Sequence, residues 1–444
     1  MVHGMDGHAE SSVDAGADGD YRNRVSVAGI ESEQTPGPSA PALLSAVGVG
    51  ASVVAIVLLG IDLRLVFGSA SAMLDEIRDA YGLGSGSAAL LTTGPVLCLG
   101  VFAVAATRAV RHRSVPAVLT GCLVLILVGT AGRGTPWWPA LVAGTLLAGV
   151  GIAVANVLGP ILVRLLFPHR IGLMTGVFTA LVSASAGIAS GITVPLDTSL
   201  FHNWRTTLVA WALPSVPAVA AMALVAWRHH RFERTATSSA RSGAPRWQAG
   251  VLRSPVAWAI TGFMGLQSLL AYSMIAWLPT IYRDRGMTAE RAGLLLTALS
   301  IASIATALTI PVVAARLSRQ SVLAIAVVAV SVTGLIGVLV GGVGMAVVWS
   351  IMLGLGQGGQ LSLALTLINL RAPNTATATS LSTMVQSIGY TIAALGPLAA
   401  GVIHGATGSW TMPLLVLLVV MMPMAACGWL AGRDNPVAVR ISGR

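Results

Sequence analysis

Long apolar segments follow one another along most of this chain and leave little room for a soluble fold. A run of about 20 apolar residues is long enough to cross a bilayer as one helix. We place the expected spans at residues 43–69, 87–108, 115–132, 138–163, 171–195, 205–227, 255–281, 289–315, 320–340, 343–368, 376–403 and 410–431. The sequence therefore predicts an all-α integral membrane protein with twelve transmembrane helices.

Charge composition supports a membrane protein and argues against a nucleic-acid partner. Only 9% of the residues are charged, against about 25% in soluble domains. The net charge of +10 comes from arginines that lie between the apolar spans, and they form no basic face. Cys98, Cys122 and Cys427 fall inside spans, with no CxxC or Cys/His spacing. We therefore expect a lipid bilayer as partner, no metal, no cofactor and no enzyme activity.

One long polar stretch, residues 228–254, divides the twelve expected spans into two sets of six. Residues 1–40 are acidic and rich in Gly, Ser and Pro, which predicts a disordered tail. Most of the 26 arginines fall on the side that holds both termini, so we expect both termini to be cytoplasmic. The expected parts are a cytoplasmic tail 1–40, an N-terminal half 41–227, a cytoplasmic linker 228–254, a C-terminal half 255–432 and a tail 433–444.

The two halves repeat each other in sequence. The segment from Met73 to Gly82 aligns with that from Trp277 to Gly286, and Gly149 and Gly151 align with Gly354 and Gly356. Parallel six-helix repeats resemble the plan of the major facilitator superfamily. That plan predicts two pseudo-symmetric six-helix halves, with a solute site near the midplane walled mainly by spans 1, 4, 7 and 10.

Asp62 and Arg64 are two charged residues inside the first apolar span. A charge near the bilayer centre costs about 2.5–3.5 kcal/mol on insertion scales, so charges there are commonly functional. Residues i and i+2 point about 200° apart on a helix, so a direct Asp62–Arg64 ion pair is poor geometry. Arg64 is the candidate substrate ligand, and a structural Arg is the alternative. Asp62 is the candidate proton-coupling group, and a structural carboxylate is an equal alternative.

Other polar side chains are candidates for the same site. The substrate-binding candidates beside Arg64 are Asn156, Gln267, Gln357 and Gln360, and further cavity candidates are Tyr272, Gln386 and Tyr390. Each could line the cavity or hydrogen-bond between helices, which is common in membrane bundles. Their concentration in the expected cavity-forming spans favours a site for the first four.

Several motifs resemble the cyanate / 2-nitroimidazole permease family. They include the segment Gly60–Arg64, Asn156-Val-Leu-Gly-Pro160, Gly265-Leu-Gln-Ser-Leu-Leu270 and Leu353-Gly-Leu-Gly-Gln-Gly-Gly359. The resemblance covers both halves in order. It implies secondary active transport of a small solute, driven by the proton gradient. Asp62 departs from the family pattern, in which Asn is common, and this departure leaves a neutral or zwitterionic solute open.

The function expected from the sequence is alternating-access transport of a cyanate-like anion or a small nitro-heteroaromatic, coupled to protons. The expected location is the cytoplasmic membrane, and the expected state is a monomer. A drug/proton antiporter is the rival of the same class, but only 5% of the residues are aromatic. A membrane-embedded enzyme or a non-transporting sensor is the rival of a different class. No catalytic cluster or added soluble domain in the sequence favours either of these.

Overall fold

The computed structural model describes residues 47–110, 112–167, 170–235, 249–373, 375–435 and 437. The tail expected at 1–40 and most of the tail expected at 433–444 lie outside these residues. Within the described ranges the chain is almost entirely helical, as the apolar spans predict. Helices suit a bilayer because they satisfy every backbone hydrogen bond within the segment.

Eight helices and one helical turn build the described part of the N-terminal half. They are α3 (Val49–Ala72), α4 (Leu74–Tyr81), α5 (Ser85–Ala109), α6 (Val115–Gly132), α7 (Trp138–Leu166), α8 (Ile171–Leu196), the turn η2 (Asp197–Phe201), α9 (Trp204–Ala210) and α10 (Ser215–Thr235). The short helix α4 follows α3 directly and ends at Gly82, which has φ 62°. Glycine suits that left-handed conformation because it has no Cβ.

Six long helices build the C-terminal half within the residues that the structure describes. They are α11 (Pro255–Arg283), α12 (Ala289–Arg316), α13 (Ser321–Val340), α14 (Ala346–Arg371), α15 (Thr375–Thr407) and α16 (Thr411–Ala431), with short turns η3 (Ala249–Arg253) and η4 (Val343–Met345). The motif Gly354–Gly359 lies inside α14, with no strand before it, so it is a helix-packing motif here.

Eleven helical segments in the described part are long and apolar enough to cross a membrane. The expected second span corresponds to α5, a helix of 25 residues. The all-helical membrane fold is therefore confirmed, whereas the count of twelve spans remains a prediction.

Two details refine the expected end of the N-terminal half. The sixth expected span, 205–227, lies within a candidate membrane span over Trp204–Phe232, in which residues 211–214 separate α9 from α10. Pro214 cannot donate a backbone hydrogen bond, and its ring disfavours the helical conformation of the residue before it, so a break here has a local cause. The linker expected from residue 228 begins inside α10, which continues to Thr235.

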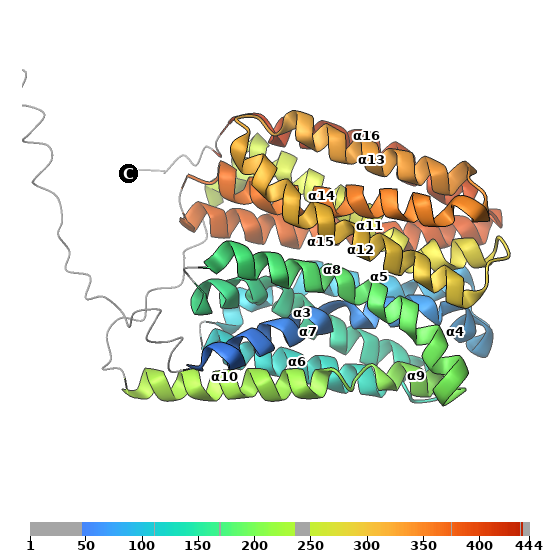
Figure 1. Ribbon diagram of the computed structural model, residues 1–444, viewed down its shortest axis with the longest axis horizontal. Helices are drawn as coiled ribbons and strands as arrows, with labels where there is room; N and C mark the ends of the chain where they lie inside the picture. Colours follow the sequence, from blue (N-terminus) through green and yellow to red (C-terminus); the bar gives the residue numbers. More distant parts are fainter. Residues whose placement is uncertain are drawn as a thin grey trace, which may run out of the picture. The chain divides into compact units, whose positions relative to one another are not determined.

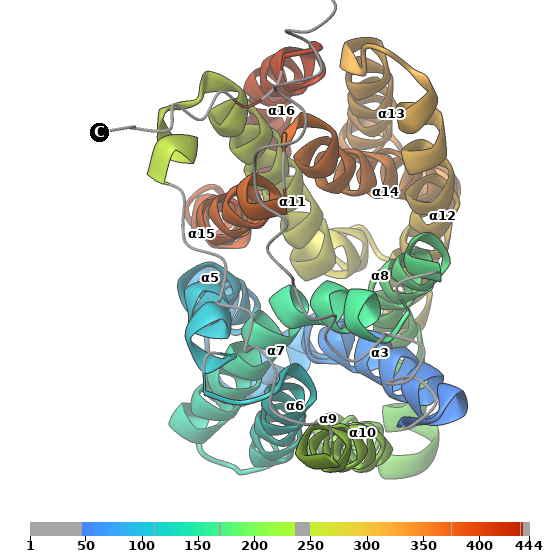
Figure 2. The same ribbon diagram turned by 90° about the vertical axis from the view of Figure 1, so that its left-hand side faces the viewer.

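The helices from α3 to α10 gather in one group and those from α11 to α16 in another, as the view along the helices shows (Figure 2). In the side view the two groups run alongside each other (Figure 1). Two helix pairs make most of the contact between the groups, α5 with α15 and α8 with α12.

Glycine allows α8 and α12 to approach closely. A Cβ added at Gly293 of α12 would lie 2.6 Å from the carbonyl oxygen of Ser190, and one added at Gly187 of α8 would lie 2.6 Å from Ser300. Thr297 of α12 also donates a hydrogen bond to the Gly187 carbonyl, at 2.7 Å. Small residues at such crossings allow close backbone packing in membranes. Larger side chains at these glycines would therefore push α8 and α12 apart.

Candidate functional site

A small cavity lies between the two halves. Its volume is about 40 Å³, room for about three water molecules. Its walls come from α3, α8, α11, α12 and α14; the lining residues are Arg64, Ser183, Ala186, Gln267, Ser268, Ala271, Tyr272, Ile275, Leu299, Ser300, Ser303, Gln357, Gly358 and Leu361. This set contains one formal positive charge and no carboxylate. The cavity therefore suits a small anion.

Arg64 faces this cavity. Its guanidinium lies 5.1 Å from the centre of the Tyr272 ring, in a cation–π contact between the halves. The side chain is partly exposed, and no described carboxylate forms an ion pair with it. A guanidinium keeps its proton and offers a planar fork of donors that matches carboxylate-like anions. The structure therefore leaves that fork available to a solute.

Two of the predicted amides also line the cavity. Gln357 of α14 is 6% exposed, and its Nε2 has no hydrogen-bond partner among the described residues. A buried donor without a partner costs about 1–3 kcal/mol, so a ligand that accepts from it recovers that free energy. Gln267 of α11 instead donates within its own helix, to Ser268 Oγ at 2.7 Å. Gln357 is thus the amide most available to a bound anion.

Four cavity serines were not among the predicted site residues. Ser183 comes from α8, Ser268 from α11, and Ser300 and Ser303 from α12. Serine in a transmembrane helix commonly bonds its own backbone, as Ser303 does with the Ser300 carbonyl at 2.7 Å. The sequence contains no pattern that distinguishes such serines from serines that face a cavity. The structure thereby adds α8 and α12 to the expected walls, whereas α7, the expected fourth span, contributes no lining residue.

Asp62 lies apart from Arg64. It is 1% exposed, and its Oδ1 accepts a hydrogen bond from Ser215 Oγ of α10 at 2.8 Å. It does not line the cavity, and no described ion pair joins it to Arg64. Asp62 and Arg64 therefore do not share one pocket. The two residues face different neighbours because a separation of two positions turns the helix through about 200°.

The other predicted polar residues make helix–helix or intrahelical bonds outside the cavity. Asn156 of α7 donates to the Tyr390 hydroxyl of α15 at 3.0 Å, which joins the two halves. Gln360 donates to Val327 O at 3.2 Å and to Ser331 Oγ at 3.0 Å, both on α13. Gln386 bonds Ser382 of its own helix at 2.9 Å. The structure thus places only Arg64, Gln267, Gln357 and Tyr272 of the predicted set around the cavity.

Charged groups tie the two halves together at the end where α4 lies. Arg283, the last residue of α11, pairs with Asp75 at 3.1 Å and with Glu76 at 3.1 Å, both on α4. Asp75 also pairs with Arg78 of its own helix at 3.3 Å. Burial raises the pKa of Asp75, and the nearby Arg283 opposes that shift.

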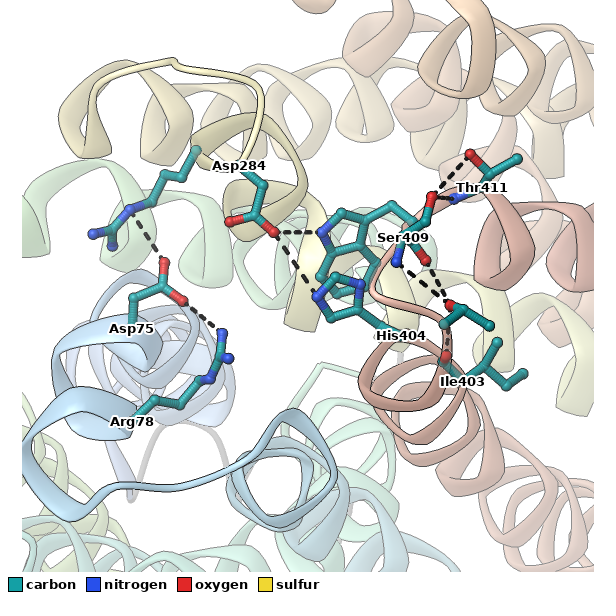
Figure 3. A network of polar contacts seen from close by, with 10 residues as sticks. Asp75, Arg78, Asp284, Ile403, His404, Ser409 and Thr411 are labelled. Carbon is teal, nitrogen blue, oxygen red and sulfur yellow. Dashed lines mark hydrogen bonds and ion pairs between the residues drawn. The ribbon is translucent and has the colours of Figure 1, made fainter.

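A second set of polar contacts at the same end joins elements of the C-terminal half. Asp284 accepts a hydrogen bond from Trp410 Nε1 at 2.7 Å, and His404 Nε2 lies 4.0 Å from the same carboxylate (Figure 3). The His404 and Trp410 rings stack, with their centroids 3.9 Å apart. These contacts hold the ends of α11, α15 and α16 to one another. Asp284 therefore makes contacts within the C-terminal half, whereas the neighbouring Arg283 makes ion pairs between the halves.

Arg133 is a charged residue that the sequence placed in a loop but the structure buries. It follows α6, is 1% exposed and donates to Ser69 Oγ of α3 at 3.2 Å. The carbonyl end of α6, where this residue lies, is favourable for a cation. Arg133 therefore belongs to the packing of the N-terminal half.

Comparisons with known proteins agree with this arrangement. The model of the Major Facilitator Superfamily matches residues 53–394 and 271–444. The 2-nitroimidazole transporter of Escherichia coli (strain K12) is 35% identical over 383 residues, which cover 86% of this chain and 95% of the relative. The cyanate transport protein CynX of the same organism is 32% identical over 358 residues, or 80% of this chain and 91% of the relative. An uncharacterized transporter, YycB of Bacillus subtilis (strain 168), is 36% identical over 384 residues, or 86% and 93%.

Solved structures show the same fold at low sequence identity. A D-xylose-proton symporter has a TM-score of 0.61 at 11% identity, over 86% of this chain and 95% of that one. A bacterial homolog of the human lysosomal transporter Spinster has a TM-score of 0.65 at 13% identity, over 86% and 96%. The sequence relatives are transporters and not enzymes, as expected. The chain belongs to the Major Facilitator Superfamily, as a secondary transporter of small solutes.

Proposed function

We propose that this transporter carries a small monovalent anion through the cavity between its halves, coupled to protons. The observation that carries the proposal is Arg64, a cation that faces the cavity with no described carboxylate partner. The unpaired Nε2 of Gln357 adds a second donor on the opposite half. Together they present donors from both halves to one solute, as alternating access requires.

Cavity size favours the smaller of the two expected substrates in this conformation. A volume of about 40 Å³ suits a cyanate-like anion of a few atoms better than a nitro-heteroaromatic ring. Tyr272 provides an aromatic face beside Arg64 that a flat heteroaromatic solute would use in a wider conformation. A relative named as a 2-nitroimidazole transporter supports keeping that second substrate in the assay.

The remaining parts of the proposal rest on sequence. The arginine distribution supports a cytoplasmic membrane protein with both termini in the cytoplasm. We propose a monomer, the simplest state for a chain that encloses its own cavity. A drug/proton antiporter remains the alternative; the absence of an acid among the cavity-lining residues disfavours export of cationic compounds.

Counterflow in proteoliposomes tests the proposal. Vesicles loaded with unlabelled cyanate should take up labelled cyanate through the wild type, and Arg64→Ala should strongly reduce that exchange at cyanate concentrations below the wild-type KM. Arg205→Ala is the matched control, because Arg205 also stacks on an aromatic ring, Trp204, at 4.4 Å, but does not line the cavity. A parallel set with 2-nitroimidazole separates the two substrate classes. Exchange in Arg64→Ala as fast as in the wild type at these concentrations would contradict the proposed anion site.

A further inference from the structure

Asp62 occupies a buried site of its own, behind the helix that carries Arg64. Its Oδ1 accepts from Ser215 Oγ at 2.8 Å, while its Oδ2 is buried and has no hydrogen-bond partner among the described residues. A buried ionised carboxylate with one open oxygen is costly unless something binds it. This open oxygen is the observation from which the inference starts.

The site lies where a transmembrane helix is interrupted. Ser215 is the first residue of α10, and the turn 211–214 separates it from α9. The N-terminal end of a helix stabilises a negative charge. Burial among apolar side chains favours the neutral acid, whereas Ser215 and the helix end favour the carboxylate. Both charge states of Asp62 therefore have structural support, which a group that binds and releases a proton requires.

Charged groups on the helices that pack on α3 lie away from Asp62. Helices α7 and α5 carry Arg164 and Arg108, each in its last turn. Helix α8, which packs on α3, has no charged residue between Ile171 and Leu196. On α10 the charged residues begin at Arg228, about 20 Å along the helix from Ser215. On α3 itself Arg64 faces the cavity, and Arg133 binds Ser69 about 10 Å further along α3. On α11 the ionisable side chains are Tyr272, in contact with Arg64, and Tyr282 and Arg283 at the helix end.

The ligand that fits this site is a proton and not a metal cation. Backbone carbonyls in the break already accept hydrogen bonds, with Ser215 N to Ala212 O at 3.1 Å and Val216 N to Leu213 O at 3.2 Å. No cluster of three His, Cys, Asp or Glu exists in the part of the chain that the structure describes. Hard cations take six or more oxygen ligands, as Ca²⁺ and Mg²⁺ do. A proton needs one oxygen, and Asp62 Oδ2 provides it.

We propose that Asp62 is the proton site of this transporter and that it lies behind α3, separate from the anion cavity on the other face of the same helix. This inference rests on the proposed anion transport. When Asp62 binds a proton it becomes neutral, so the field of Arg64 at the cavity becomes more positive and favours an anion. When Asp62 releases the proton, that preference weakens. Proton and anion then move in the same direction.

The test separates exchange from accumulation. Wild-type proteoliposomes with an acidic exterior should concentrate labelled cyanate and admit protons, measured with an entrapped pH-sensitive dye. Asp62→Asn should retain cyanate counterflow, which needs no net proton movement, and lose at least tenfold of the gradient-driven accumulation. Asp197→Asn is the matched control, since Asp197 also accepts from a hydroxyl, that of Thr207, at 2.8 Å but lies in the turn after α8.

A second variant keeps the test informative if Asp62→Asn fails to fold. Ser215→Ala removes the hydroxyl that favours the carboxylate, so half-maximal uptake should shift to higher pH while maximal uptake is kept. Unchanged accumulation in Asp62→Asn, an unshifted pH profile in Ser215→Ala, or a requirement for Na⁺ in the wild type would each overturn the inference. Loss of counterflow in a stably folded Asp62→Asn protein would also overturn it. Absence of counterflow in the wild type would instead reject the proposed anion transport.

Discussion

Arg283 and Glu76 form a two-point ion pair across the halves of this transporter. The Arg283 Nη2 lies 3.1 Å from Glu76 Oε1, and the Nη1 lies 3.4 Å from Oε2. The same arginine reaches Asp75 through Nε at 3.1 Å. Helix α11 is thereby tied to α4 at the end opposite the linker. Any state that opens the cavity at this end has to separate these groups.

Neutralising Glu76 should favour opening at this end. Glu76→Gln removes a partly exposed ion pair, and such pairs contribute about 0.2–1 kcal/mol, so the open population should rise up to about fivefold. Spin labels at the exposed positions Asp79 and Glu290 would report the distance between the halves. Asp284→Asn is the control, because the Asp284 partners Trp410 and His404 lie in its own half. An equal change in the label-to-label distance in both variants would contradict the proposed role of the Arg283–Glu76 ion pair.

Protonation of Asp75 should favour closure at this end, whereas neutralising Glu76 should favour opening. Burial raises its pKa in the closed arrangement, so this state binds a proton more tightly than an open state in which Asp75 is solvated. The state that binds more protons gains stability as the pH falls. Acidic pH should therefore favour closure at this end. In Asp75→Asn the distance between the same labels should lose that pH dependence; a profile identical to the wild type would contradict the assignment.

Arg64 should need its planar fork as well as its charge. Charge-assisted hydrogen bonds contribute about 1.5–3 kcal/mol, so Arg64→Ala should raise the KM for cyanate by about tenfold or more. Arg64→Lys keeps the charge but loses the two-point geometry, and should fall between the wild type and Arg64→Ala. Initial rates of uptake against substrate concentration measure this order. A Lys variant equal to the wild type would show that charge alone suffices.

Gln357 and Gln360 are neighbouring amides that should give opposite mutant phenotypes. Gln357→Leu removes a donor that has no partner among the described residues, so it should not lower Tm in detergent and should raise the KM about two- to tenfold. Gln360→Leu removes bonds to Val327 O and Ser331 Oγ, so it should lower the free energy of unfolding by about 1–2 kcal/mol. Its KM should stay near the wild-type value. Thermal unfolding and uptake kinetics on the two variants distinguish a substrate-binding role for Gln357 from a packing role for Gln360.

The sequence alone identified the class of fold and its most informative charge. Long apolar spans leave helices as the stable solution in a bilayer, and the internal repeat indicated two halves. Arg64 could be singled out because a cation in an apolar span needs a reason, and the structure places it at the cavity. The separation of Asp62 from Arg64 also followed from helix geometry, before any contact was known.

Tertiary structure decided which side of each helix meets which neighbour. In α14 and α11 nearly every face is apolar or small, so periodicity could not show that Gln357 faces the cavity and Gln360 faces α13. Ser183 and Ser300 became cavity residues only through the crossing of α8 and α12. The same holds for Asp62, whose partner Ser215 is 153 residues away. An apolar sequence specifies that helices lie in the membrane, but their packing determines which polar groups meet.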